Sequence, residues 1–209
     1  MTRIFLLLLT ALICVPAALA QSSDRDVSRY EFYIGYAHER ATNNAERFDK
    51  NGKVSFNGTP VLFASQREGY NGFNAEFNQN VTRHVGIVTS LSGTYDKTGY
   101  VDTVTGRTFN ASVQRYDLMI GPRYNWRPES VTPFVHALFG VTHMRVNFDD
   151  ALTSCRKADT AFAMAFGGGL DVHAGEHIDV RAVQVDYLPT FFGGKRQDNL
   201  RVGAGIKIK

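Results

Sequence analysis

Side chains of two kinds alternate along many short stretches of this chain, and this alternation restricts the folds it can adopt. In the stretch 162–167, Phe, Met and Phe alternate with Ala, Ala and Gly. Successive side chains of a β-strand point to opposite faces, whereas an amphipathic helix needs a period near 3.6 residues. The pattern therefore predicts strands that have one bulky apolar face and one small or polar face.

The same period of two recurs in eight segments that cover much of the chain after residue 28. They lie at 29–38, 70–78, 85–95, 109–124, 132–141, 161–172, 178–187 and 200–208. Short connections alternate with long ones at 39–69, 96–108, 145–160 and 188–199. The short connections permit only antiparallel hairpins. The phase of the seventh segment slips at Ala182 and Val183, which predicts a β-bulge there.

Residue size decides which face of these strands lies inside. The polar face consists mostly of Gly, Ala, Ser, Asn and single charges, whereas the other face carries Phe, Tyr, Ile, Leu and Val. An eight-stranded barrel is only just wide enough to be filled by side chains, so the small face belongs inside. We therefore predict an all-β fold, an eight-stranded antiparallel up-and-down transmembrane β-barrel with its apolar face outward and a polar or small interior.

A barrel in a lipid bilayer must be closed, because the hydrocarbon core offers no hydrogen-bond partners to its backbone. In hydrocarbon an open sheet edge leaves unpaired amide groups that cost several kcal/mol each, so the first and last strands must pair. Aromatic rings near the strand ends are typical of the girdles that such barrels place at the two membrane interfaces. The candidates are Tyr30, Tyr36, Tyr95, Tyr124, Trp126 and Tyr187.

The N-terminus has the features of a secretory signal peptide. An apolar run at 4–15 is followed by Ala18-Leu19-Ala20 and then by polar residues, which predicts cleavage after Ala20. Residues 21–28 would form a short tail and 29–209 the barrel. Of the 23 Lys and Arg residues, Arg3 lies in the leader, and the remaining 22 nearly balance the 20 Asp and Glu residues. Without a basic block, a nucleic-acid partner is not expected.

Several charged residues share the small face and would point into the lumen. Charges inside a barrel are costly unless they are paired, so we expect interlocked ion pairs that plug the lumen. The alternative is an ion-selective pathway lined by the same side chains. These predicted interior residues are Glu31, Glu76, Asp117, Arg123, Asp171, Arg181, Asp186 and Arg201.

Motifs for catalysis, metals or cofactors are missing from the sequence. It contains no His-x-x-x-His spacing on a helix, because the pair His173 and His177 lies by a predicted turn. It also contains no Gly-x-Ser-x-Gly and no glycine loop that ends in Lys-Ser or Lys-Thr. We therefore expect no enzyme, no cofactor and no metal or ligand-binding site. Two alternatives stay open: a lipid-modifying hydrolase or acyltransferase on the same barrel, and a soluble secreted barrel that binds an apolar ligand.

The leader, the eight alternating segments and the closing strand resemble the OmpA-like transmembrane domain, or more generally the outer membrane protein beta-barrel domain family. Suggestive stretches are 131–140 (VTPFVHALFG), 166–172 (FGGGLDV) and 180–187 (VRAVQVDY). The resemblance implies a place in the bacterial outer membrane, lipid neighbours, long loops outside the cell, and a structural, adhesive or small-pore role. No peptidoglycan-binding domain is expected.

The last strand also resembles the family's assembly signal, in which a polar residue, a glycine and two hydrophobic positions recur at fixed spacing. The resemblance implies that the barrel assembly machinery binds this strand. The matching positions are Arg201, Gly203, Ile206 and Ile208.

Overall fold

The structure is a computed structural model, and it describes residues 27–42, 54–56, 59–61, 67–101, 108–149, 154–193 and 195–209. The predicted leader at 1–20 and residues 21–26 of the predicted tail lie outside the described residues. Within the described ranges, no helix is long and apolar enough to cross a membrane.

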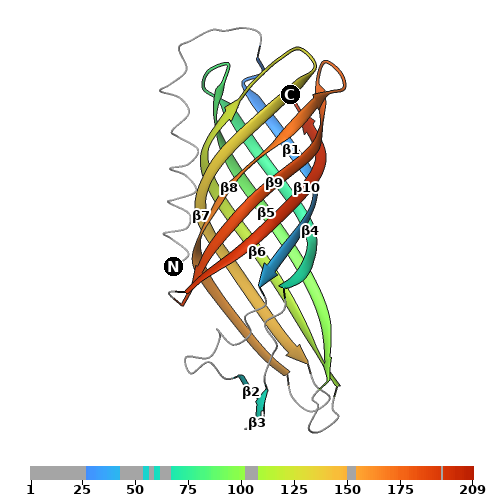
Figure 1. Ribbon diagram of the computed structural model, residues 1–209, viewed down its shortest axis with the longest axis vertical. Helices are drawn as coiled ribbons and strands as arrows, with labels where there is room; N and C mark the ends of the chain where they lie inside the picture. Colours follow the sequence, from blue (N-terminus) through green and yellow to red (C-terminus); the bar gives the residue numbers. More distant parts are fainter. Residues whose placement is uncertain are drawn as a thin grey trace.

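Eight long strands form one closed antiparallel barrel in the order β1-β10-β9-β8-β7-β6-β5-β4 (Figure 1). This confirms the predicted architecture. The strands are β1 (Tyr30–Thr42), β4 (Arg67–Asn80), β5 (Val85–Val101), β6 (Thr108–Asn125), β7 (Val131–Asp149), β8 (Ser154–His173), β9 (Ile178–Phe192) and β10 (Lys195–Ile208). The turn end of the barrel carries the connections 81–84, 126–130 and 174–177, and the loop end carries the other four.

The first and last strands close the barrel by pairing, as predicted. Tyr36 lies opposite Ala204 and Phe32 opposite Ile208 in an antiparallel ladder. The predicted bulge is also confirmed, because the ladders of β9 with both neighbours shift register around Ala182 and Val183. The bulge inserts one residue, so Arg181 and Gln184 both point inward although they are three positions apart.

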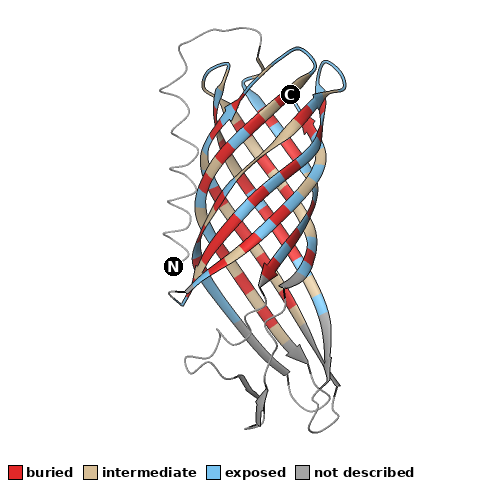
Figure 2. Ribbon diagram, in the orientation of Figure 1, coloured by how far each residue is buried: buried red, intermediate tan, exposed pale blue. Residues whose placement is uncertain are grey.

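Buried and exposed residues alternate along every barrel strand, which gives the striped ribbon in Figure 2. Ile34 and Phe32, at 62% and 58% exposed, project outward from β1, whereas Glu31 and Glu39 are buried. The bulky apolar face is therefore outside. The alternative of a soluble barrel with an apolar interior is wrong, because the charged side chains occupy the inside.

The strands are longer at the loop end than the sequence predicted. β5 and β6 leave only 102–107 between them, β7 and β8 leave 150–153, and β9 and β10 leave 193–194. The predicted connections at 96–108, 145–160 and 188–199 are therefore too long. The hydrogen-bonded ladders continue beyond the apolar zone with polar side chains outside, and Gly193, at φ 55°, permits the tight turn after β9. Cys155, which falls within the predicted connection at 145–160, lies in β8 opposite Phe148.

Two short strands interrupt the predicted first loop at 39–69. β2 (Val54–Phe56) and β3 (Thr59–Val61) pair with each other in a separate two-stranded antiparallel sheet. They lie in the connection between β1 and β4, the longest at the loop end. The sequence alternation had not indicated them, because three residues are too few to show a period.

Candidate functional site

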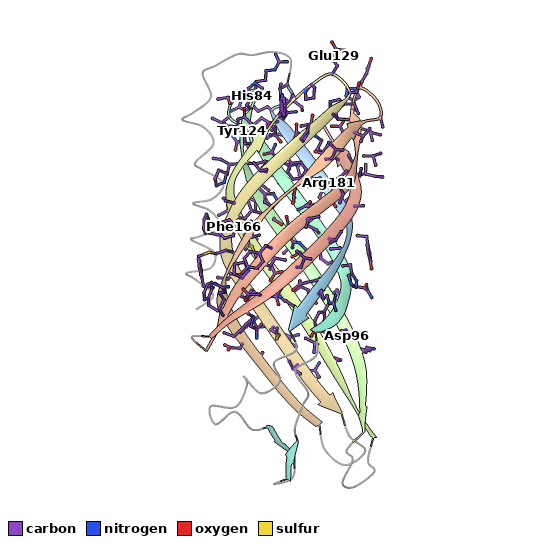
Figure 3. All side chains as sticks on the ribbon, in the orientation of Figure 1. His84, Asp96, Tyr124, Glu129, Phe166 and Arg181 are labelled. Atoms are coloured by element: carbon purple, nitrogen blue, oxygen red, sulfur yellow. The ribbon has the colours of Figure 1, made fainter. Side chains whose placement is uncertain are left out.

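Arg181 lies in the polar interior, and Figure 3 labels it in the half of the barrel nearer the turn-end residues His84 and Glu129. Its Nη1 donates to Glu76 Oε2 at 2.6 Å and to Gln184 Oε1 at 2.7 Å, and its Nε donates to Asp171 Oδ1 at 2.8 Å. The guanidinium carbon also lies 3.9 Å from the centre of the Tyr33 ring. Every direction around this cation is thus occupied by a carboxylate, an amide or an aromatic face.

The bulky ring of Phe134 points into the lumen, although most inward side chains are small or polar. Its ring centre lies 3.5 Å from the guanidinium carbon of Arg123 and 4.4 Å from that of Arg181. Two buried cations so close together repel each other, and an aromatic face between them offsets part of their lost hydration. The fifth predicted segment looked irregular in the sequence for this reason.

Toward the turn end, two lysines form ion pairs with the buried carboxylates. Lys207 Nζ lies 2.8 Å from Asp179 Oδ2 and 3.0 Å from Asp171 Oδ2. Lys209 pairs with Asp179 at 2.7 Å, and Arg127, from the connection between β6 and β7, pairs with Glu31 at 3.0 Å. Arg127 also donates to the carbonyl oxygen of Arg83 in the neighbouring turn. These contacts place several ion pairs at the turn end of the lumen.

A second group of ion pairs lies nearer the loop end. Arg115 pairs with Glu39, and its Nε lies 3.0 Å from Asp117 Oδ1. Arg201 Nη2 lies 2.8 Å from Asp186 Oδ2. The other oxygen of Asp186 lies 2.9 Å from His136 Nε2.

Several of these contacts cross the lumen instead of following the wall. Arg181 on β9 reaches Glu76 on β4, and Arg115 on β6 reaches Glu39 on β1. In each case the two strands are three positions apart in a ring of eight. In so narrow a barrel, side chains that join nearly opposite walls fill the cross-section. Bonded side chains therefore cross the lumen at these two levels.

Charge inside the barrel is nearly balanced among the described residues. Seven acidic and five Lys or Arg side chains are buried in the lumen. Half-buried Arg127 and Lys209 add two cations at the turn end. Removing one partner of a buried pair leaves an uncompensated charge, which costs about 3–5 kcal/mol. The network is therefore cooperative. The acids are Glu31, Glu39, Glu76, Asp117, Asp171, Asp179 and Asp186, and the bases are Arg115, Arg123, Arg181, Arg201 and Lys207.

All eight residues that the sequence placed in the interior are buried there and make ion pairs. Four further members were missed: Glu39, Arg115, Asp179 and Lys207. Glu39 fell just outside the predicted first strand. The signal for the other three was present, because Arg115, Asp179 and Lys207 have the same parity as Asp117, Arg181 and Arg201 on their own strands.

One candidate catalytic pair of side chains lies on the outer wall of the barrel. Across the described ranges, no cluster of three or more His, Cys, Asp or Glu residues could hold a metal ion. On the outer face near the loop end, however, His143 Nδ1 lies 2.8 Å from Thr160 Oγ1. This places an imidazole beside a hydroxyl on the lipid-facing wall.

Exposed aromatic side chains lie toward both ends of the outer wall. Tyr30, Tyr124 and Trp126 lie near the turn end, and Trp126 is 67% exposed. Tyr36, Tyr95 and Tyr187 lie on the outer face toward the loop end. Between them the wall is aliphatic or phenylalanine-rich, and Figure 3 labels one of these residues, Phe166, together with Tyr124. The predicted girdle residues thus border an apolar band on both sides.

Comparison with known proteins agrees with this geometry. Residues 5–207 match the family described as the outer membrane protein beta-barrel domain. The structure of Ail, the attachment invasion locus protein of Yersinia pestis, is similar, with 17% identity and a TM-score of 0.52 over 85% of this chain and 97% of Ail. The Neisserial surface protein A structure has 12% identity and a TM-score of 0.52 over 87% of this chain and 97% of that chain. No curated protein matches the sequence.

Proposed function

The chain belongs to the outer membrane protein beta-barrel domain family and resides in the bacterial outer membrane, and from that premise we propose that it is a structural and adhesive surface protein. Its barrel is a rigid, filled scaffold, and the connections at the loop end face the outside of the cell. The observation that carries this proposal is the set of ion pairs across the lumen, led by Arg181 with Glu76.

We infer that the lumen conducts no steady flow of ions, because each cation is held by a carboxylate from another strand. Planar-bilayer recording on the refolded full chain tests this point. We expect no steady conductance above the bare bilayer. The control is Arg123→Ala combined with Arg181→Ala, which removes the two cations that pack against Phe134. A stable ohmic conductance from the unaltered protein would establish a small pore instead.

The adhesive part of the proposal concerns the connection between β1 and β4. Ail, which has a similar fold, is an attachment invasion locus protein and has been solved with the heparin analogue sucrose octasulfate. We would therefore measure attachment of cells that express the chain to heparin-coated and bare surfaces. A variant with 43–66 replaced by a short Gly-Ser linker should keep its heat-dependent gel mobility shift but lose attachment. Equal attachment by both forms would contradict an adhesive role for this connection.

A second candidate function is lipid hydrolysis, and the observation that favours it is the contact between His143 and Thr160. A hydroxyl nucleophile needs a base, and the base is normally oriented by a third group. In the described part of the chain, no carboxylate is hydrogen-bonded to His143. We therefore rank this candidate second and expect no catalysis. Release of fatty acid from phospholipid vesicles, abolished by both His143→Ala and Thr160→Ala, would reverse the ranking.

We also propose that the barrel assembly machinery recognises β10. Ile206 and Ile208 project outward and are half exposed, whereas Arg201 is buried and ion-paired. Outward apolar residues on the closing strand are accessible to a partner before β1 pairs with it. Ile206→Ser with Ile208→Ser should lower the amount of folded protein in outer membranes, whereas Val183→Ser with Val185→Ser on β9 should not. Equal yields from the two double variants would overturn this assignment.

A further inference from the structure

A polar patch interrupts the outer face of β5, β6, β7 and β8 near the loop end. We call it the rim patch and define it by Tyr95, Lys97, Tyr116, His143, Arg145 and Thr160. All six belong to the outward-facing parity of their strands, because their chain neighbours Thr94, Arg115, Thr142, Met144 and Ala161 are buried inside. In Figure 3 the adjoining residue Asp96 is labelled well away from the turn-end residues His84 and Glu129.

The strand register arranges the rim patch in rows. The outermost apolar row consists of the partners Leu91, Leu118, Val141 and Phe162. The next outward-facing row contains Tyr116, His143 and Thr160, and the row after it contains Tyr95, Gln114 and Arg145. Strand residues rise about 3.4 Å each, so successive rows on one face lie about 7 Å apart. The wall therefore changes from hydrocarbon-like to polar within two rows, and the second row carries the cation Arg145.

Hydrogen bonds inside the rim patch leave donors unused. Tyr95 donates to Tyr116 at 3.1 Å, and since two hydroxyls share one bond, one hydroxyl hydrogen stays free. The Nε of Arg145 is buried and has no hydrogen-bond partner among the described residues. Within the same ranges Lys97 forms no ion pair. Among the described residues, Lys97 and Arg145 therefore lack an ion-pair partner, and one phenol hydrogen lacks an acceptor.

The opposite side of the same rim differs. There Arg196 is paired with Asp198 at 2.8 Å, and Tyr187 donates to the same carboxylate. His38 Nδ1 lies 2.8 Å from Asn71 Oδ1, which also accepts from Tyr36 at 2.5 Å. On β1, β4, β9 and β10 the polar groups above the apolar band thus bond to one another. In the rim patch on β5 to β8, two cations are available to another molecule.

We propose that the rim patch binds the phosphate-bearing headgroup of an outer-leaflet glycolipid, an inference that rests on the proposed orientation of the loop end. Arg and Lys form strong charge-assisted hydrogen bonds with phosphate oxygens. Tyrosines at the boundary hold their rings in the acyl region and their hydroxyls at the headgroup. Phe162 and Val141, one row nearer the barrel centre, contact the acyl chains. The patch combines the two surfaces that such an amphipathic anion presents.

Native mass spectrometry of the full chain, refolded in zwitterionic detergent, tests the proposal. The probe is bisphosphorylated lipid A, compared with its dephosphorylated form and with inorganic phosphate. The test variant is Lys97→Gln with Arg145→Gln. The matched control is Arg83→Gln with Arg196→Gln, which removes the same charge from an exposed turn-end position and from a cation that Asp198 already neutralises. A heat-dependent mobility shift verifies that each form is folded.

We expect lipid A to remain bound to the unaltered chain and to the control, and to bind at least tenfold more weakly to the test variant. Dephosphorylated lipid should bind weakly to all three. Equal losses in test and control variants, or equal retention, would overturn the proposal, as would binding of inorganic phosphate as tight as that of lipid A. Because the assay uses micelles, its failure is distinguishable from failure of the structural and adhesive role, which is measured by bilayer conductance and cell attachment.

Discussion

The Nη1 atom of Arg181 lies 2.6 Å from Oε2 of Glu76, although the two residues are on strands at nearly opposite sides of the barrel. This one contact ties together walls that share no backbone hydrogen bond. It depends on barrel closure, and it also stabilises the closed barrel, because removing either residue would leave the remaining buried charges unbalanced.

Arg181→Leu is therefore expected to lower the free energy of unfolding by about 3–5 kcal/mol. The substitution removes the cation with the shortest contacts to both Glu76 and Asp171 and leaves Arg123 as the cation they share, at 3.3 and 3.5 Å. Urea unfolding of the refolded protein in micelles measures the change, with Arg83→Gln as an exposed control that should alter stability by less than about 0.5 kcal/mol. An Arg181→Leu barrel as stable as the parent would show that the central ion pairs contribute nothing.

Gly140 lies where β6 and β7 approach closely. A Cβ built on Gly140 would lie 2.0 Å from the carbonyl oxygen of Leu118, which is backbone and cannot turn aside. Gly140→Ala should destabilise the barrel by about 1–3 kcal/mol through forced backbone shifts. Gly175→Ala is the matched control, because nothing lies within 4 Å of its Cβ position. Urea unfolding in micelles measures the stability of both variants. Equal unfolding midpoints for the two variants would contradict the close approach of β6 and β7 at Gly140.

Trp126 is the only tryptophan of the chain, so its fluorescence reports one position. It is largely exposed and follows β6 at the turn end, where a girdle ring lies at the headgroup level. In vesicles, lipids brominated near the headgroup should quench Trp126 more strongly than lipids brominated near the chain end. Phe166→Trp in a Trp126→Phe background should show the reverse order. The prediction fails if deep bromines quench Trp126 best.

Closure between β1 and β10 is testable by cross-linking. Tyr36 and Ala204 are direct register partners, so Tyr36→Cys with Ala204→Cys should form a disulfide in the folded protein when Cys155 is replaced by Ser. Phe32→Cys with Ala204→Cys is displaced by four residues, or about 14 Å along the strand, and should not cross-link. Mass spectrometry of proteolytic fragments distinguishes the two. A high yield from the displaced pair would indicate a different register.

The alternation of side chains made most of the fold predictable. A period of two is a local property, since it follows from the geometry of each strand and needs no knowledge of its neighbours. The bulge at Ala182 and Val183 could be read for the same reason, as a break in local phase. The strand ends at the loop side were less predictable, because beyond the apolar band both faces are polar and the period fades. Cys155 illustrates this, since it lies in β8 although the sequence indicated a loop.

The membership of the interior network was predictable only in part. Parity places a charge inside, and eight residues were recognised in this way. Phe134 and Tyr33 have the inward parity of the charged residues, but their rings are larger than the small or polar side chains predicted for the interior. Both stack on Arg181, and Phe134 also stacks on Arg123. A ring inside a narrow barrel is stabilised when it faces a cation that has lost its hydration, and that arrangement is invisible until both strands are placed.

By itself, the sequence determined that the chain forms strands, that eight of them close, and which of their faces meets lipid, because these depend on local period and on the size of side chains. Only the tertiary structure decided which charges pair. Arg115 meets Glu39 and Arg181 meets Glu76 because closure brings strands three positions apart face to face across the lumen. Such distances are set by strand tilt and stagger around the whole ring, and no single strand encodes them.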